Sequence, residues 1–312
     1  MEHKAGFVNI IGNPNVGKST LMNALVGERI SIITSKAQTT RHRILGIVNG
    51  EDFQAVFSDT PGIIKPAYEL QESMMDFVKV AFEDADVLIY MVEMGEKEMK
   101  NEAFFEKIKN VKVPLILLLN KIDKSTQTEL EDQVAFWTKM VPNAEILPIS
   151  ALENFNIQTV MDRIVKLLPV SPPYYPKDQL TDKPERFFVN ETIREKILIH
   201  YKKEIPYSVE IETEEFKEEK NIIRIRSVIM VERDTQKGII IGHKGSALKR
   251  VGSEARKDLE KFFGKKRPDM FGAKSVFHAH IEHAFWGRDD EQQNEHSQGD
   301  SKESPIDVLV IP

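Results

Sequence analysis

An eight-residue glycine-rich segment near the start of the chain has the pattern of a phosphate-binding loop. Residues 12–19 read Gly-Asn-Pro-Asn-Val-Gly-Lys-Ser and fit G-x-x-x-x-G-K-[ST], in which backbone N–H groups surround phosphate oxygens. An apolar segment precedes it and an amphipathic one follows, which is the strand–loop–helix context of a P-loop. We expect Lys18 to reach the β- and γ-phosphates and the Ser19 hydroxyl to bind Mg²⁺. The predicted nucleotide contacts in this segment are Gly12, Asn13, Asn15, Val16, Gly17, Lys18, Ser19 and Thr20.

Three later motifs complete the predicted site, and two of them select guanine over adenine. Asp59-Thr-Pro-Gly62 ends an apolar run, so its carboxylate can hold Mg²⁺ through water and the Gly62 amide can meet a γ-phosphate. Asn120-Lys121-Ile122-Asp123 ends another run, and a carboxylate there accepts from guanine N1–H and the exocyclic amine. Ser150-Ala151-Leu152 follows the last run and offers a backbone N–H to guanine O6. Four motifs in this order predict a GTP/GDP site and disfavour an ATP-dependent kinase or ATPase.

A mobile threonine completes the predicted magnesium site. In GTP switches such a residue coordinates Mg²⁺ while the γ-phosphate is present and releases it after hydrolysis. The segment Gln38-Thr39-Thr40-Arg41 lies between the P-loop and the next strand. We favour Thr40, with Thr39 as the alternative. The candidate metal ligands are then Ser19, Thr40 and Asp59, and the candidate catalytic residues are Lys18, Thr40 and Gly62.

The elements that position these residues alternate between strands and helices up to about residue 168. Apolar runs such as Pro-Leu-Ile-Leu-Leu-Leu-Asn have no polar face, which is typical of a parallel sheet covered on both sides. Amphipathic helices are predicted between them, at 70–82, 101–109, 129–140 and 157–168. This alternation predicts a doubly wound α/β domain over residues 1–168. Asn49-Gly50 predicts an antiparallel hairpin at the sheet edge.

A second unit is predicted after a proline-rich segment. Residues 169–184 have no helical or strand period and are interpreted as a semi-rigid linker. A helix at 188–203 and two strands follow, and then Gly242-His243-Lys244-Gly245 precedes a helix with Leu248, Val251, Ala255, Leu259 and Phe262 on one face. Such a loop lets a nucleic-acid backbone approach closely. Residues 237–266 hold nine Lys or Arg against three Asp or Glu, a local charge of +6, and the predicted RNA contacts are Gly242, His243, Lys244, Gly245, Lys249 and Arg250.

Composition limits the remaining classes of function. The 312 residues are 41% hydrophobic and 29% charged, with a net charge of −6, as in ordinary two-domain globular proteins. The absence of cysteine excludes disulfides, thiolate metal sites and cysteine nucleophiles, and it is typical of a reducing cytoplasm. No apolar run has the length of a membrane span, and the first residues do not have the pattern of a signal peptide. A cytoplasmic protein is predicted.

The motifs together resemble the Era family of GTPases. The resemblance rests on GNPNVGKST, KAQTTRHRI, DTPGI, NKID, PISA and the segments 171–198 and 239–266. It implies slow GTP hydrolysis, GTP and GDP states, a KH-type α+β domain at 185–285, and a role in 30S assembly through small-subunit rRNA. It implies that the hydrophobic Ile63 replaces a water-orienting glutamine. Some relatives recruit K⁺ through an asparagine at the place of Asn15. A monomer is expected, and peripheral association with the inner face of the cell membrane is a further expectation.

The resemblance ends after Lys266. The segment Ser-Val-Phe-His-Ala-His-Ile-Glu-His-Ala-Phe alternates and predicts a substitute edge strand with Phe277, Ala279 and Ile281 on one face. His278, His280 and Glu282 share the other face, where an exposed polar surface is favoured over a metal site. Residues 286–312 are predicted to be disordered. The alternative to an RNA-binding switch is a nucleotide-gated module for a membrane or protein partner, which the basic G-x-x-G region disfavours.

Overall fold

The chain divides into two compact units, Met1–Lys183 and Pro184–Pro312, and each is considered by itself. The computed structural model describes residues 2–97, 101–219, 222–266, 274–283 and 308–310, the last two ranges by their backbone. The helices and strands of unit 1 are β1 (Lys4–Gly12), α1 (Lys18–Val26), β2 (Ile44–Asn49), β3 (Phe53–Asp59), α2 (Glu69–Glu83), β4 (Val87–Glu93), α3 (Glu102–Lys109), β5 (Leu115–Asn120), the 3₁₀ turn η1 (Ile122–Lys124), α4 (Gln127–Met140), β6 (Ala144–Pro148) and α5 (Ile157–Leu167).

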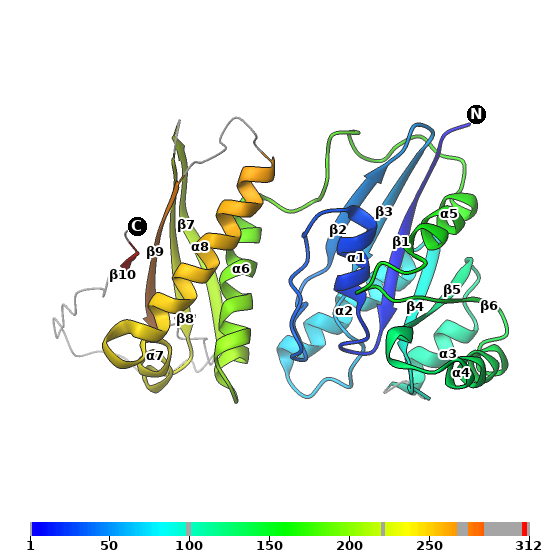
Figure 1. The fold of residues 1–312 in the computed structure, drawn as a ribbon, viewed down its shortest axis with the longest axis horizontal. Helices are drawn as coiled ribbons and strands as arrows, with labels where there is room; N and C mark the ends of the chain where they lie inside the picture. Colours follow the sequence, from blue (N-terminus) through cyan, green and yellow to red (C-terminus); the bar gives the residue numbers. More distant parts are fainter. Residues whose placement is uncertain (1, 98–100, 220–221, 267–273, 284–307, 311–312) are drawn as a thin grey trace, which may run out of the picture. The chain divides into compact units, whose positions relative to one another are not determined.

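Unit 1 is a six-stranded sheet in the order β2-β3-β1-β4-β5-β6. All neighbouring strands are parallel except β2 and β3, so the predicted Asn49-Gly50 hairpin and the doubly wound α/β class are confirmed. Strands β4 and β5 are almost wholly buried because helices cover both faces. Helices α2, α3 and α4 pack with one face of the sheet in a shared apolar core, and α1 lies with α5 (Figure 1).

The segment predicted to be a semi-rigid linker is bound to unit 1. Residues 170–182, which we call the strap, bond first to the start of β1 and to Gln54 of β3, and then to the outer edge of β2. The Ile47 amide donates to Leu180 O at 2.8 Å, and the Leu45 amide donates to the Asp182 carboxylate at 3.0 Å. An edge strand presents unpaired N–H and C=O groups, and the strap pairs part of that edge of β2. The linker assigned to 169–184 stays a prediction, and these bonds to unit 1 could not be foreseen because they are long-range and leave no periodic signal.

One buried glutamine fixes the middle of the strap. The Gln54 side chain, fully buried on β3, accepts from the Tyr174 and Tyr175 amides at 2.7 and 2.9 Å and donates to Tyr175 O at 2.8 Å. The Tyr174 ring stacks on Phe7 of β1, with 5.4 Å between ring centroids. Three hydrogen bonds from one amide satisfy backbone groups that would otherwise lose solvent contact without compensation.

Unit 2 places helices on one face of a small sheet. Its elements are α6 (Glu185–His200), η2 (Ile205–Tyr207), β7 (Val209–Glu219), β8 (Ile222–Val231), α7 (Asp234–Ile241), η3 (His243–Gly245), α8 (Ser246–Lys266), β9 (Lys274–His283) and β10 (Val308–Val310). The strand order is β10-β9-β8-β7, and α6 and α8 lie together beside the sheet (Figure 1). One apolar core joins α6, β7, β8, α7 and α8.

Three sequence predictions for unit 2 are corrected. The strand expected after Lys266 exists as β9, but it pairs with β8 on one side and β10 on the other, so it is not an edge strand. The short apolar run Val308–Val310 forms β10, although disorder was predicted there. The rest of 286–312 lies outside the described residues, as do the side chains of His278, His280 and Glu282. In α8 the buried position belongs to Phe263 rather than Phe262, which packs at the margin of the core.

Candidate nucleotide and RNA sites

The P-loop joins β1 to α1 in a conformation that needs glycine. Gly17 precedes the helix with φ +107°, and a Cβ there would lie 2.3 Å from the Asn120 side-chain nitrogen. Left-handed backbone of this kind is unstrained only for glycine. The loop therefore turns tightly into α1, where the first free N–H groups of the helix face the pocket and favour an anion.

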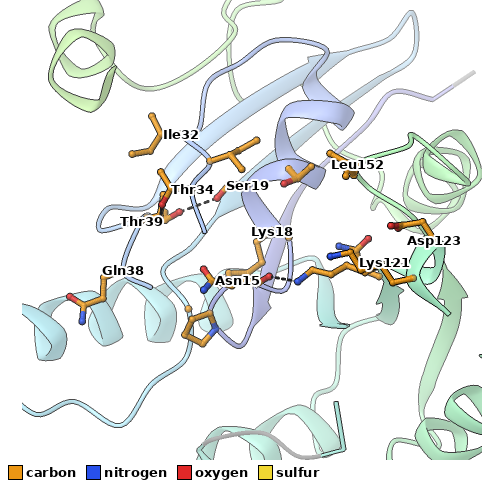
Figure 2. Close-up of a pocket in the computed structure, with 18 residues that line it drawn as sticks. Asn15, Lys18, Ser19, Ile32, Thr34, Gln38, Thr39, Lys121, Asp123 and Leu152 are labelled. Carbon is orange, nitrogen blue, oxygen red and sulfur yellow. Dashed lines mark hydrogen bonds between the residues drawn. The ribbon is translucent and has the colours of Figure 1, made fainter. Parts of the chain in front are cut away.

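The predicted site residues line one pocket at the carboxyl ends of the parallel strands. Figure 2 shows Lys18 and Ser19 between Thr34 and Thr39 on one side and Lys121 and Asp123 on the other. The predicted residues that line the pocket are Asn15, Gly17, Lys18, Ser19, Thr20, Thr40, Gly62, Asn120, Lys121, Asp123 and Leu152. Six predicted contacts are not among the lining residues, namely Gly12, Asn13, Val16, Asp59, Ser150 and Ala151.

Lys18 is buried at the base of the pocket. Its ammonium group donates to Gly12 O at 3.2 Å and to Asn13 O at 2.9 Å. Burial lowers the pKa of Lys18 to about 8, against the opposing attraction of the Asp59 and Glu96 carboxylates. A buried ammonium group gains most from a nearby anion, so this lysine is suited to hold a phosphate.

Three oxygen-bearing side chains converge beside Lys18. The Ser19 hydroxyl donates to the Asp59 carboxylate at 2.8 Å and lies 3.0 Å from the Thr40 hydroxyl, which donates to the same carboxylate oxygen at 3.4 Å. The other carboxylate oxygen of Asp59 is buried and has no hydrogen-bond partner within the described structure. Burial raises the pKa of Asp59, while Lys18 and the hydroxyl groups oppose that rise. Hard oxygen donors of this kind suit Mg²⁺.

The geometry favours Thr40 over Thr39 as the metal ligand. The Thr39 hydroxyl donates to Lys36 O at 2.7 Å and lies 2.7 Å from the Thr34 hydroxyl. It is therefore engaged within its own loop, although Thr39 also lines the pocket. Ile63, which follows Gly62, is fully buried in the core of unit 1 and its amide donates to Gly12 O at 3.0 Å. No side chain from position 63 therefore reaches the pocket to orient water.

Asn120 connects the loops around the base side of the pocket. Its amide nitrogen donates to Val16 O of the P-loop at 2.7 Å, and its oxygen accepts from the Ala151 amide at 2.9 Å. Asn120 thus supports the P-loop and the 150–152 loop. The contact predicted between a backbone amide of this loop and guanine O6 stays a prediction, because the Ala151 amide is bonded to Asn120.

Asp123 is the exposed acceptor at the base side of the pocket. It accepts from the Ser150 hydroxyl at 2.6 Å, which fixes the carboxylate while leaving it accessible. Lys121, with φ +66°, donates to Asn15 O of the P-loop at 2.8 Å (Figure 2) and pairs with Glu93.

Sequence reasoning missed part of the pocket wall. Residues Pro14, Ile32, Ile33, Thr34, Gln38 and Lys124 also line it. Four of them belong to residues 27–43, which we call the switch loop, where the structure has neither helix nor strand. A loop without periodicity gives no signal of which side chains point inward.

In unit 2 the G-x-x-G loop joins α7 to α8 and is open to solvent. Gly242 has φ +71°, and a Cβ there would lie 2.6 Å from the Ala247 Cβ, so glycine is required. The predicted RNA contacts His243, Lys244 and Lys249 are accessible to solvent. Arg250 is exposed as well and pairs with Glu254 at 3.2 Å.

Comparisons with known proteins agree with both sites. A family model described as "50S ribosome-binding GTPase" matches residues 7–121, and a KH domain model matches residues 204–282. The chain is 45% identical over 269 residues to GTPase Era of Alkaliphilus metalliredigens, covering 85% of this chain and 91% of that protein. It is also 45% identical to GTPase Era of Staphylococcus haemolyticus, over 85% and 89% of the two chains.

The chain belongs to the Era family of GTPases. Two solved Era structures each share 36% identity and a TM-score of 0.83, covering 90% of this chain and 94% of theirs. One is Era in complex with MgGDPNP and nucleotides 1506–1542 of 16S ribosomal RNA, and the other is a point variant of Aquifex aeolicus Era bound to GDP·AlF4⁻. The KH match of this Era-family chain reaches residue 282 in β9, which pairs with β8, so the departure seen after Lys266 does not remove this strand from the domain.

No helix in the described part of this Era-family chain is both long and apolar enough to cross a membrane. Within the same residues, no group of three or more His, Cys, Asp or Glu side chains could hold a metal ion. The magnesium site inferred above is different in kind, since two of its three oxygen donors are hydroxyl groups.

Proposed function

We propose that this chain is a GTP-hydrolysing switch that binds small-subunit rRNA through its KH unit and acts in 30S assembly. The convergence of Ser19, Thr40 and Asp59 beside Lys18 supports it most directly. A threonine from a loop without regular structure, held next to a buried carboxylate and a P-loop serine, is the arrangement by which a γ-phosphate can order a switch.

Each residue has a distinct role in this proposal. Ser19 and Thr40 would bind Mg²⁺ directly and Asp59 through water, and the ion would neutralise charge on the β- and γ-phosphates. Lys18 stabilises the phosphate oxygens, and the Gly62 amide meets the γ-phosphate. Because Ile63 is buried, water is oriented without a side chain from that position, which supports slow hydrolysis.

The RNA side of the proposal rests on the open G-x-x-G loop and on the solved relative. That Era holds 16S rRNA nucleotides 1506–1542, and the exposed basic residues beside Gly242 here suit the same backbone chemistry. A cytoplasmic location follows from a ribosomal partner, and we propose that the protein acts there as a monomer. Peripheral membrane contact remains an expectation that vesicle sedimentation would test.

Potassium is a subordinate part of the proposal. The Asn15 amide nitrogen donates to Ser35 O at 3.1 Å, which places this side chain against the switch loop, where an ion could bridge the two. Hydrolysis rates in matched KCl and NaCl buffers, for wild type and Asn15→Ala, test it. Equal rates in the two salts would remove K⁺ from the mechanism.

A pair of adjacent substitutions tests the switch. Thr40→Ala should leave GDP affinity within about twofold and lower GTP-analogue affinity and hydrolysis by about tenfold or more, as loss of metal-site groups does. Thr39→Ala is the matched control and should stay near wild type. The reverse pattern would transfer the role to Thr39, and two silent variants would refute the switch assignment.

Crosslinking tests the partner. Full-length protein with a non-hydrolysable GTP analogue should crosslink to 16S rRNA at the nucleotides that correspond to 1506–1542 when mixed with total RNA, and less so with GDP. Crosslinks spread evenly over unrelated RNAs in both nucleotide states would instead favour the nucleotide-gated module for a protein or membrane partner.

A further inference from the structure

Arg43 ends the switch loop and makes a two-pronged ion pair with helix α2. It precedes β2 directly and lies three residues after Thr40. Its Nη1 donates to one Asp84 carboxylate oxygen at 2.6 Å and its Nη2 to the other at 3.0 Å. The Arg43 side chain is 13% exposed and that of Asp84 38%. Asp84 is the C-cap of α2, the helix that follows the Asp59–Gly62 motif. Parallel donation of this kind fixes orientation as well as distance.

The same guanidinium group also forms hydrogen bonds to strands β3 and β1. Its Nε donates to the Ser58 hydroxyl at 2.6 Å, and Nη2 donates to the Asn9 side-chain oxygen at 3.2 Å. Ser58 and Asn9 are fully buried and face each other in the register of β3 and β1. Ser58 immediately precedes Asp59. Arg43 is therefore fastened to the strand that carries the metal-site carboxylate.

Asn9 closes the network. Its amide nitrogen donates to the Asp84 carboxylate at 2.6 Å and also to Ala81 O. A buried asparagine in a central strand would cost free energy if its polar atoms were unpaired. Here β1, β3, α2 and the end of the switch loop meet through four side chains.

This network limits how far Thr40 can move. Three residues of extended chain span at most about 10–11 Å, and the intervening His42 ring packs edge-on against Phe77 of α2, with 6.1 Å between centroids. Thr40 itself is held at the metal site by its hydroxyl contacts. The fixed point that keeps it within reach is Arg43.

We propose that Arg43 is a positioning residue for the GTP-bound state. It acts by holding the end of the switch loop to Ser58 and Asp84 so that Thr40 stays beside Asp59. The inference rests on the proposed role of Thr40 in metal binding. Lysine cannot replace Arg43, because an ammonium group lacks the planar guanidinium geometry that reaches both Asp84 oxygens and Ser58 together.

The test compares Arg43→Lys, Asp84→Asn and the double variant in the full chain. We expect GDP affinity within about twofold of wild type and GTP-analogue affinity and hydrolysis lower by about tenfold, the usual cost of disturbing groups that orient a metal ligand. The double variant should be no worse than the worse single variant, because both remove the same interaction. Arg163→Lys is the matched control, since Arg163 pairs with Glu145 at 2.5 Å elsewhere in unit 1, and it should leave both affinities unchanged.

Three outcomes would overturn the inference. Equal losses of GDP and GTP-analogue affinity would indicate that the Arg43–Asp84 pair is merely structural. Wild-type behaviour of Arg43→Lys alongside a defective Thr40→Ala would remove the positioning role. Additive effects of the two single substitutions in the double variant would show that Arg43 and Asp84 act separately.

Amide hydrogen exchange over residues 38–43 with the GTP analogue gives a readout that does not depend on Thr40. Faster exchange in Arg43→Lys than in Arg163→Lys supports the anchor even if Thr40→Ala is silent, in which case the proposed metal role of Thr40 fails and the anchor stands. Equal exchange in the two variants would refute the anchor.

Discussion

Nucleotide binding should take up a proton at Lys18, so raising the pH should weaken it. In the free protein, burial holds the pKa of Lys18 at about 8. Phosphate oxygens next to the ammonium group favour its charged form and raise that pKa in the complex. Binding is then linked to protonation: affinity is fully present below about pH 8 and falls as the pH rises toward the pKa of the complex.

The size of the loss in GDP affinity follows from the pKa of Lys18 in the free protein. The fraction of Lys18 that has lost its proton is about one tenth at pH 7, one half at pH 8 and nine tenths at pH 9. GDP affinity should thus fall about twofold by pH 8 and about tenfold by pH 9. The nucleotide phosphates do not contribute, since their last ionisation lies near pH 6. The guanine N1 proton begins to ionise at about pH 9, and Lys18→Arg supplies the baseline for that effect.

Titration calorimetry in two buffers with different ionisation heats measures the proton uptake itself. The uptake should be about half a proton per GDP bound at pH 8. The titration is done in EDTA, so that metal binding does not change the protonation of Asp59. Lys124→Gln, a change at another lysine of the pocket wall, should keep the wild-type profile. Lys18→Arg keeps its positive charge throughout this range. It should bind GDP less tightly, and the fall in affinity that comes from deprotonation of Lys18 should be absent. Constant GDP affinity from pH 7 to 9, or no proton uptake at pH 8, would refute the reasoning.

Three other changes give distinct outcomes. Asp123→Asn should lower GTP affinity at least about a hundredfold, since two charge-assisted hydrogen bonds are worth about 1.5–3 kcal/mol each, and should favour xanthosine triphosphate; unchanged selectivity in competition binding would contradict it. Gly62→Ala should slow hydrolysis about a hundredfold in single-turnover assays, because the new Cβ would lie 2.6 Å from Pro14 Cα and a displacement near 1 Å costs about that much; a normal rate would mean that the loop yields freely. Aspartates at His243 and Lys244 should weaken RNA binding at low salt through like-charge contacts and leave GTP hydrolysis intact, and equal RNA affinity would remove the KH loop from the RNA site.

The residues that could touch a nucleotide were predictable because their chemistry depends on short local spacing. The P-loop, Asp59, Asp123 and the Asn49-Gly50 hairpin each follow from a motif next to an apolar run, and each lies where expected. Helix ends were less certain. Helix α4 begins at Gln127, two residues before the predicted start, because Thr126 and Glu129 form a reciprocal capping pair that fixes the first turn.

The residues that support the site could not be predicted in the same way. Gln54 and Arg43 act through partners far away in sequence, and their types have many other uses. Asn120 was predicted as part of a nucleotide motif, but its links to Val16 and Ala151 were not. Helix α7 shows the same limit, since its run of isoleucines with one glycine has no clear helical signature. Its conformation depends on tertiary contacts, among them the Tyr201 hydroxyl donating to Ile240 O at 2.6 Å, and such contacts override local propensity.

The switch loop is fixed at both of its ends, which defines the part that can respond to a γ-phosphate. At the first end, the Asn23 side chain of α1 accepts from the Ile30 and Ser31 amides at 3.0 and 2.9 Å and donates to Ser31 O at 2.8 Å. At the other end, Arg43 binds α2 and the sheet, and β2 beyond it lies between β3 and the strap. Residues 32–42 lie between these two anchors, and this interval contains Thr40 together with most of the pocket-lining residues that sequence reasoning missed. If Thr40 and Arg43 have the proposed roles, loss of the γ-phosphate should release Thr40 without disturbing β2, because the movement should end at Arg43.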